Sequence, residues 1–243
     1  MSALEGQDLG QYQIIEQIAK GGMATVYRAT QSSIGRNVAI KLLPRNFTHD
    51  DTFIERFNRE VEIIAQLQHP HILPVYDYGN FDDMPYIVMA YMRGGTLEDR
   101  VKSGAMNVHE IKRVCKQVAD ALDFAHSTNI IHRDFKPANI LMGERGNTYL
   151  ADFGLAKLTE VASNITGASI LGTPAYMSPE QTGPGELTGA VDIYAFGAII
   201  FQMFTGQIPF EAPTASGILM AHVMNPVPNI HDLRPDVPDA GQL

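Results

Sequence analysis

Short runs of apolar residues, separated by turn-forming residues, predict β-strands in the first ninety residues of the chain. The predicted strands cover Tyr12–Ile18, the residues after Tyr27, Val38–Lys41, Val75–Tyr78 and Pro85–Ala90, with a turn at residues 79–83. Between Asp51 and Gln68 the apolar residues instead recur every three or four positions, which is the period of a helix with one buried face. The N-terminal part is therefore predicted to be a sheet with one helix.

The second part of the chain is mainly helical by the same criterion. An apolar stripe from Ile111 to Leu122 predicts a helix over residues 108–128, and a short hairpin is expected over residues 140–151. Another helix is expected over Ala215–Met224, before a proline-rich stretch at 225–238. The longest uncharged segment, Ile193–Phe210, contains glutamine, glycine and proline. It is therefore predicted to be a buried helix and a turn, not a membrane span.

Composition excludes several classes of protein. With 243 residues, 45% of them hydrophobic, the chain can bury a core in one large domain or two small lobes. A net charge of −9 argues against general binding to nucleic acid or to an anionic membrane. The single cysteine, Cys115, excludes an internal disulfide and lies on the apolar stripe, so we expect a small buried side chain. No signal peptide is visible at the N-terminus, so we expect a cytoplasmic chain.

Eight residues carry the candidate chemistry, His-Arg-Asp-Phe-Lys-Pro-Ala-Asn at positions 132–139, between two apolar pairs. Asp134 can orient an attacking hydroxyl and accept its proton, and Lys136 can neutralise a moving phosphate. Asn139 offers a neutral oxygen to Mg²⁺, a hard cation that prefers oxygen ligands. Thirteen residues later the run Asp-Phe-Gly begins at Asp152, which provides a second oxygen ligand. These residue types suit phosphoryl transfer.

The order and spacing of these two motifs resemble the catalytic loop and the magnesium loop of the eukaryotic-like (Hanks-type) protein kinases. The segments Gly-Gly-Met-Ala-Thr-Val-Tyr-Arg-Ala and Gly-Thr-Pro-Ala-Tyr-Met-Ser-Pro-Glu-Gln resemble the bacterial branch of that family. Lys136 and Thr173 resemble serine/threonine kinases more than tyrosine kinases. The resemblance implies an α+β, two-lobed protein-kinase-like fold. Residues 11–92 would form a nucleotide-binding lobe with an antiparallel sheet and one helix, and residues 93–243 a mainly helical catalytic lobe without its last helices.

The resemblance also implies the reaction and its partners. The chain would transfer the γ-phosphoryl group of ATP to serine or threonine hydroxyls of proteins, with Mg²⁺ held by Asn139 and Asp152. An alternative is a kinase-shaped module that binds ATP with little or no catalysis. Dimerisation through the N-terminal lobe or the activation segment is left open. Full-length bacterial relatives often continue into a membrane span and a sensor, so a longer, membrane-anchored form is also left open.

A glycine-rich hairpin follows the first predicted strand. Glycines at a hairpin tip allow backbone N–H groups to approach phosphates. The first and third glycines of the family pattern are Ala19 and Ala24 here. Met89 would close the back of the nucleotide pocket, while the carbonyl of Ala90 and the N–H of Met92 would bind adenine. The full set of nucleotide-binding residues implied by the resemblance is Ile18, Ala19, Lys20, Gly21, Gly22, Ala24, Val26, Ala39, Lys41, Met89, Ala90, Met92 and Leu141.

Lys41 and Glu60 are expected to form an ion pair. The helical period places Glu60 along the buried stripe of its helix, where a carboxylate needs a cationic partner. Lys41, at the end of an apolar strand, is the obvious candidate and matches the family's ion pair that holds the α- and β-phosphates. Alternatively, Lys41 is a solvated edge residue and Glu60 extends into solvent beside Glu62.

A long polar segment over residues 155–173 corresponds to the activation loop of the family. Arg133 supplies a cation that could bind a phosphate on this loop. We expect autophosphorylation, first at Thr166 and then at Ser169 or Ser163. A flexible polar loop without modification is the alternative.

Two further features have two possible interpretations each, and a third, Glu180, has one. Asp192 opens the most apolar helix, where it could favour the helix dipole or, as in the family, bind the backbone of the catalytic loop. His69-Pro70-His71 could suggest a metal site, but a turn is expected because no third ligand is near in sequence. Glu180 lacks the arginine that pairs with it in the family. We therefore expect Glu180 to be buried without a partner and the protein to be marginally stable.

Overall fold

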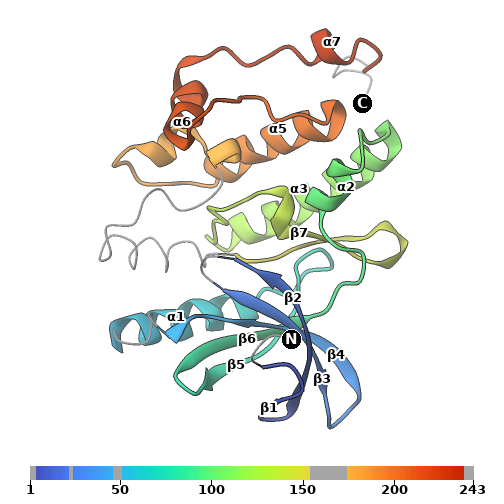
Figure 1. Cartoon of the computed structure of the whole chain (residues 1–243). Helices are drawn as coiled ribbons and strands as arrows, with labels where there is room; N and C mark the ends of the chain where they lie inside the picture. The colour runs from blue at the N-terminus through green and yellow to red at the C-terminus, as the bar shows by residue number, and fades with distance from the viewer. Residues whose placement is uncertain (1–3, 22–23, 46–50, 154–173, 238–243) are drawn as a thin grey trace. The chain divides into compact units, whose positions relative to one another are not determined.

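The computed structural model describes residues 4–21, 24–45, 51–153 and 174–237, and the chain divides into two compact units (Figure 1). The first unit takes in the residues up to Gln68 together with Leu73–Met92. The second takes in His69–Ile72 and the described residues from Arg93 onward. The chain therefore crosses between the units after Gln68, after Ile72 and after Met92.

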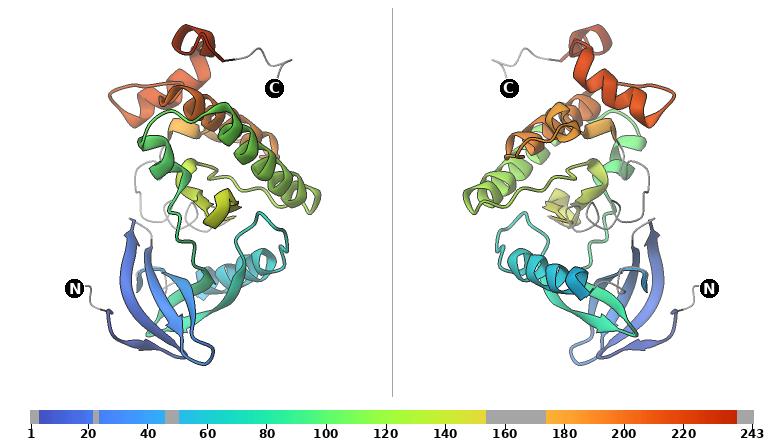
Figure 2. Two further views of the ribbon diagram at one scale, coloured as in Figure 1. Left: turned by 90° about the vertical axis from the view of Figure 1, so that its right-hand side faces the viewer. Right: turned by 90° about the vertical axis from the view of Figure 1, so that its left-hand side faces the viewer.

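The first unit is built on a six-stranded sheet in the order β1-β2-β3-β4-β6-β5, and every neighbouring pair is antiparallel. Its strands are β1 (Asp8–Leu9), β2 (Tyr12–Lys20), β3 (Thr25–Gln31), β4 (Arg36–Leu42), β5 (Val75–Phe81) and β6 (Met84–Ala90). Helix α1 (Asp51–Ala65) lies beside β5 (Figure 2). This arrangement confirms the predicted antiparallel sheet with one helix.

The hairpin between β5 and β6 is tighter than the sequence suggested. The predicted turn at residues 79–83 is wrong, because Gly79 and Asn80 remain paired within β5. The turn consists of Asp82 and Asp83, whose φ angles of 48° and 60° suit a two-residue hairpin connection. Gly79 belongs in the strand for a packing reason, since a Cβ there would lie 2.9 Å from the hydroxyl of Tyr86.

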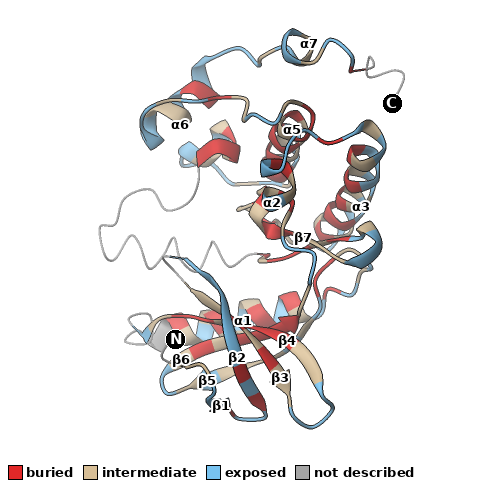
Figure 3. Ribbon diagram, turned by 45° about the vertical axis from the view of Figure 1, so that its right-hand side comes forward, coloured by how far each residue is buried: buried red, intermediate tan, exposed pale blue. Residues whose placement is uncertain are grey.

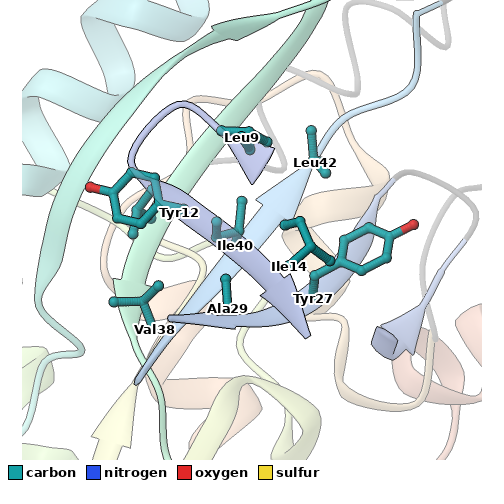
Figure 4. Packing of buried hydrophobic residues seen from close by; sticks show 9 residues of the cluster. Leu9, Tyr12, Ile14, Tyr27, Ala29, Val38, Ile40 and Leu42 are labelled. Atoms are coloured by element: carbon teal, nitrogen blue, oxygen red, sulfur yellow. The ribbon is translucent and has the colours of Figure 1, made fainter. Parts of the chain in front are cut away.

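One face of the sheet carries the hydrophobic core of the first unit (Figure 4). The buried side chains of this cluster are Leu9, Tyr12, Ile14, Tyr27, Ala29, Val38, Ile40, Leu42 and Val88. The strand register explains the grouping, because Ile40 lies opposite both Tyr27 and Val88. Residues directly opposite in an antiparallel pair point to the same face, so three strands contribute to one layer of side chains.

The second unit is mainly helical, as expected. Its helices are α2 (Leu97–Lys102), α3 (Val108–Ser127), α5 (Ala190–Thr205), α6 (Ala215–Met224) and α7 (Ile230–Leu233). Short 3₁₀ turns are η2 (Pro137–Asn139), η3 (Glu144–Gly146), η4 (Pro174–Tyr176) and η5 (Pro179–Thr182). A two-stranded hairpin, β7 (Ile140–Met142) and β8 (Thr148–Leu150), completes it. The short helices α2 and α7 were not predicted.

Helices α3 and α5 form the centre of this unit and contact each other. Figure 3 shows buried positions along one side of α3 and over much of α5. Helix α3 begins at Asn107, whose side chain accepts a hydrogen bond from the N–H of Glu110. Helix α5 ends at Gly206, which has the left-handed conformation that terminates many helices. The predicted helix over residues 108–128 agrees with α3 to within one residue.

Several smaller expectations can be compared with the structure. Cys115 is half-buried, less than the buried side chain that was expected, and burial raises the pKa of its thiol to about 11. His69-Pro70-His71 lies in an irregular connection, as expected.

Glu180 is exposed, so the prediction of a buried, unpaired carboxylate is wrong. Water solvates this carboxylate, and the stability cost expected for burying it does not arise.

Both histidines of that connection are held by protein groups. His69 Nε2 lies 3.3 Å from a carboxylate oxygen of Asp120, and His71 Nδ1 lies 3.0 Å from the carbonyl oxygen of Thr148. Within the described residues, no group of three or more His, Cys, Asp or Glu could hold a metal ion. The described helices also include none long and apolar enough to cross a membrane.

Ile40 offers a test of the core. Its side chain is fully buried, so Ile40→Ala removes apolar burial and leaves a cavity, and we expect the free energy of unfolding to fall by about 2–5 kcal/mol. Urea denaturation followed by circular dichroism measures the change. Ile34→Ala is the matched control, because Ile34 is 64% exposed. Equal effects of the two substitutions would contradict the assignment of the core.

Candidate active site

The centre of the candidate site is the loop that begins at His132 and ends in η2. Lys136 Nζ lies 2.6 Å from the carboxylate of Asp134. The side-chain amide of Asn139 donates to the backbone carbonyl of Asp134 at 2.7 Å and reaches its carboxylate at 3.3 Å. The carboxylate of Asp134 is thus oriented from two sides while its side chain remains 38% exposed. The structure brings together all three loop residues to which the sequence assigned chemistry.

Asp192 of α5 holds this loop through its backbone. Its two carboxylate oxygens accept hydrogen bonds from the N–H groups of His132, at 2.8 Å, and Arg133, at 2.9 Å. The Asp192 side chain is 1% exposed, and the ring of His126 provides a third contact, 2.8 Å from Nε2 to the carboxylate. The expected bond between Asp192 and the catalytic-loop backbone is confirmed. Such buried carboxylates are tolerated only where hydrogen bonds compensate for lost water.

His132 connects the loop to the residue before Asp152. Its Nε2 lies 2.8 Å from the carbonyl oxygen of Ala151, and its ring packs against Phe153 with ring centroids 4.7 Å apart. The N–H of Ala151 in turn donates to the carbonyl of Asn139 at 2.9 Å. Two hydrogen bonds therefore fix the start of the Asp-Phe-Gly run to the catalytic loop.

Asn139 and Asp152 suit a divalent cation with a preference for oxygen. Because the amide nitrogen of Asn139 donates to Asp134, its Oδ1 is the atom left to bind a metal. Asp152 adds a half-buried carboxylate at a position with φ of 65°, held in place by the bonds of its neighbour Ala151. Mg²⁺ usually takes one or two protein ligands and completes its shell with waters and phosphate oxygens. The two residues present fit that requirement.

In the first unit, five of the predicted nucleotide-binding residues share one face of the sheet. In register, Val26 lies opposite Ala19 on β2 and Lys41 on β4, and Ala39 lies opposite Met89. Lys41 and Ala39 are two residues apart, so they occupy the same face of β4. This is the face opposite the hydrophobic cluster of Figure 4, whose β4 members Val38, Ile40 and Leu42 alternate with them.

The same face therefore carries short or flexible side chains around one lysine. Ala19 is exposed and Ala39 is buried, so little side-chain volume covers the backbone at either position. Lys41 and Glu60 are both half-buried and both belong to the first unit. Their ion pair stays a prediction.

The other predicted nucleotide-binding residues are distributed over both units. In β2 and the turn after it, Ile18, Lys20 and Gly21 are exposed, and the N–H of Gly21 donates to the carbonyl of Ala24 at 2.9 Å. Ala90 is buried and its N–H donates to Pro74 at 3.0 Å, while Met92 is half-buried. Leu141 belongs to β7 in the second unit. Gly22 lies outside the described residues.

Comparison with known proteins decides the family. A model of the protein kinase domain matches residues 12–239, nearly the whole chain. The chain belongs to the protein kinase domain family. The match agrees with the fold and catalytic-loop motifs described above.

Individual relatives of this kinase domain are bacterial. It is 41% identical to a probable serine/threonine-protein kinase PknB of Lactococcus lactis, over 94% of this chain and 37% of the relative. It is 39% identical to the serine/threonine-protein kinase PrkC of Bacillus subtilis, over 95% of this chain and 36% of the relative. The chain thus spans little more than a third of the length of these curated relatives.

A solved structure gives the same result for the fold. The crystal structure of the Mycobacterium tuberculosis PknI kinase domain superposes with a TM-score of 0.74 at 30% identity, covering 97% of this chain and 86% of that one. The predicted protein-kinase-like fold is therefore confirmed.

Some predicted positions of this kinase domain lie outside the described residues. They are Thr166, Ser169, Ser163 and Thr173. The cation expected to bind a phosphorylated loop, Arg133, is described. Its Nε is buried and, within the described part of the chain, has no hydrogen-bond partner.

Two residues at the site of the kinase domain were missed from the sequence. His126 contacts Asp192 from the last turn of α3. The sequence could have indicated it, because it is a polar residue four positions after Leu122 on the buried stripe. The second is Gln181, whose side chain donates to the carbonyl of Arg133 at 2.8 Å. No local pattern marks Gln181, because its partner lies 48 positions away in the chain.

His222 on α6 lies beside the described end of the activation segment. It is 5% exposed, its Nδ1 lies 2.8 Å from the hydroxyl of Tyr194, and its ring packs edge-on against Phe210. Burial lowers the pKa of the imidazole, and the backbone of Ala175 opposes this shift. The imidazole thus links α6 to α5.

Substitution of Asp192 tests the support of the loop. In Asp192→Asn one carboxylate oxygen is replaced by an N–H₂ group, which cannot accept from a backbone N–H, so a buried donor loses its partner. We expect the free energy of unfolding to fall by about 1–3 kcal/mol. Urea denaturation measures this, with Asp123→Asn on the exposed side of α3 as control. If both variants unfolded at the same urea concentration, the conclusion that Asp192 supports the catalytic loop would be wrong.

The buried imidazole makes stability depend on pH. Unfolded His222 takes up a proton at pH about 6.5, whereas the folded state takes it up only at lower pH. The free energy of unfolding should therefore fall as the pH drops below about 6.5. Urea denaturation at pH 7.5 and 5.5 measures the difference, which should be smaller in His222→Gln. An equal loss in both proteins would assign the pH dependence to other groups.

Proposed function

We propose that this kinase domain transfers the γ-phosphoryl group of ATP to serine and threonine hydroxyls of proteins. The observation that carries the proposal is the geometry around Asp134. Its carboxylate is oriented by Asn139 and Lys136 yet remains accessible, as a base that must meet a substrate hydroxyl requires. Both bacterial relatives described above are named serine/threonine-protein kinases, which supports the choice of acceptor.

The residues divide the work of the reaction. Asp134 would orient the attacking hydroxyl and accept its proton, while Lys136 would neutralise charge on the transferred group. Lys41 would hold the α- and β-phosphates, with Glu60 orienting the lysine. When bound, Mg²⁺ neutralises phosphate charge, and Asn139 and Asp152 would hold it. Catalysis would then consist mainly of positioning and electrostatic stabilisation.

Nucleotide binding is proposed for residues 11–92. The shared sheet face of Ala19, Val26, Ala39, Lys41 and Met89 supports this assignment. The adenine would meet Val26 and Ala39, and its polar edge would bind backbone groups of Ala90 and Met92. The catalytic residues are proposed for residues 93–243, and Leu141 would contribute from there. Action on protein substrates, dimerisation and a cytoplasmic location are further parts of the proposal.

The activation segment is proposed to carry phosphate. Arg133 has a buried guanidinium nitrogen without a hydrogen-bond partner among described residues, and a phosphate could supply one. Thr166 is the first candidate, followed by Ser169 and Ser163.

Intact mass after incubation with Mg-ATP tests the activity. We expect the parent to gain phosphate and Asp134→Asn to gain none, because the amide cannot accept the proton. Lys116→Gln, on an exposed position of α3, serves as a surface control that should resemble the parent. A folded parent without added phosphate would refute transfer and favour an ATP-binding module. Peptide mapping of the phosphorylated parent then tests the order of Thr166, Ser169 and Ser163.

A further inference from the structure

Gln181 joins the segment that precedes η5 to the catalytic loop. Its side-chain Nε2 donates to the carbonyl of Arg133 at 2.8 Å. Its Oε1 accepts from the N–H of Ser178 at 3.0 Å and lies 3.3 Å from the hydroxyl of the same serine. Ser178 is fully buried, so the bridge is anchored in packed structure and not on a mobile surface side chain.

Arg133 needs support on both sides because its backbone is strained. Its φ of 67° is in the left-handed region, which is unfavourable for a residue other than glycine. Asp192 accepts from its N–H, and Gln181 donates to its carbonyl. The carbonyl of Arg133 belongs to the same peptide plane as the N–H of Asp134. The contact of Gln181 thus fixes the peptide that leads into the candidate base.

We propose that Gln181 is a positioning residue that aligns the substrate-binding stretch with Asp134. This inference rests on the proposed kinase activity and adds to it. Residues 174–178 lie directly before η5. Their sequence, Pro-Ala-Tyr-Met-Ser, resembles the substrate-binding stretch of the protein kinases, so this part of the chain would bind the protein substrate. A single amide holds the end of this stretch through Ser178 and the entry to the catalytic base through Arg133. The two parts of the site are therefore set in register by one side chain.

Tyr176 shows that the stretch has other attachments that do not reach the loop. Its hydroxyl donates to Gln202 of α5 at 2.7 Å, which fixes η4 to a helix. Among the described hydrogen bonds, only the one from Gln181 joins residues 174–182 to the catalytic loop. Loss of Gln181 should consequently affect alignment more than attachment.

Two substitutions separate the donor from the rest of the side chain. Gln181→Met keeps the length of the side chain and removes both hydrogen bonds. Gln181→Glu keeps the acceptor for Ser178 but loses the N–H donor to Arg133 when the carboxyl is ionised. Thr182→Val is the matched control on the same short turn, because its hydroxyl donates to the carbonyl of Pro179 within that turn.

Phosphate transfer from Mg-ATP to myelin basic protein is the first measurement. We expect Gln181→Met to lower kcat roughly tenfold while the KM for ATP stays within twofold, and Thr182→Val to resemble the parent. The inference fails if Gln181→Met retains the parent kcat. A parent that transfers no phosphate would instead refute the proposed activity.

The pH profile distinguishes alignment from a general loss of structure. Protonation of the introduced carboxyl in Gln181→Glu restores a donor to the Arg133 carbonyl. A carboxyl beside a carbonyl oxygen in a half-buried site has a raised pKa. The rate of this variant relative to the parent should therefore rise as the pH is lowered from 8 to 6. A flat ratio below one would overturn the proposed role of the donor.

Hydrogen exchange provides a readout that does not need activity. Deuterium uptake by peptides that span residues 130–136 should be faster in Gln181→Met than in the parent and in Thr182→Val. Peptides from α3, which Gln181 does not contact, should exchange at the parent rate. Unchanged exchange in the catalytic loop, or equal acceleration throughout the second unit, would refute the bridge even in a parent without kinase activity.

Discussion

The catalytic loop depends on the carboxylate of Asp192. This carboxylate accepts hydrogen bonds from two backbone N–H groups and contacts the ring of His126, and the Asp192 side chain is 1% exposed. A buried charge is stable only when its lost hydration is replaced, and here the loop backbone supplies the replacement. The carboxylate in return holds Arg133 at a positive φ angle. Because Asp134 directly follows Arg133, a residue of α5 sets the position of the candidate base.

A close approach between α3 and α5 makes this contact possible. At Gly189, just before α5, a Cβ would lie 2.7 Å from Nδ1 of His126. Glycine at this position lets the histidine ring reach the carboxylate of Asp192 from the far end of α3. The packing of two long helices and the shape of a catalytic loop are thus parts of one arrangement.

The sheet of the first unit carries its hydrophobic core and the proposed nucleotide-binding residues on opposite faces. The β4 residues Val38, Ile40 and Leu42 enter the hydrophobic cluster, and the alternate residues Ala39 and Lys41 point to the other face. Two-residue periodicity allows one strand to serve both purposes without conflict. The face with Lys41 and its alanines can therefore be shaped for phosphate and adenine with little effect on the core.

The sequence by itself determined the sheet, the longer helices, the family resemblance and the residues of the catalytic loop. These features are local: helical stripes, apolar runs and a charged loop can be recognised within a few neighbouring positions. It misjudged the hairpin turn after β5, because Tyr86 packs where a side chain at position 79 would lie. It also misjudged Glu180, since the sequence gives no measure of how much of the chain covers a given carboxylate.

The family resemblance indicated Asp192, and only the tertiary structure decided which other distant residues support the loop. Asp192 and Gln181 bind the backbone of residues 132–133, and His126 contacts Asp192, across packing that no local pattern encodes. The requirement for a partner can be inferred from a buried polar side chain, but the choice of partner depends on how helices and turns pack. The residues that carry the candidate chemistry could therefore be recognised in the sequence, whereas the fold fixes how these residues are positioned.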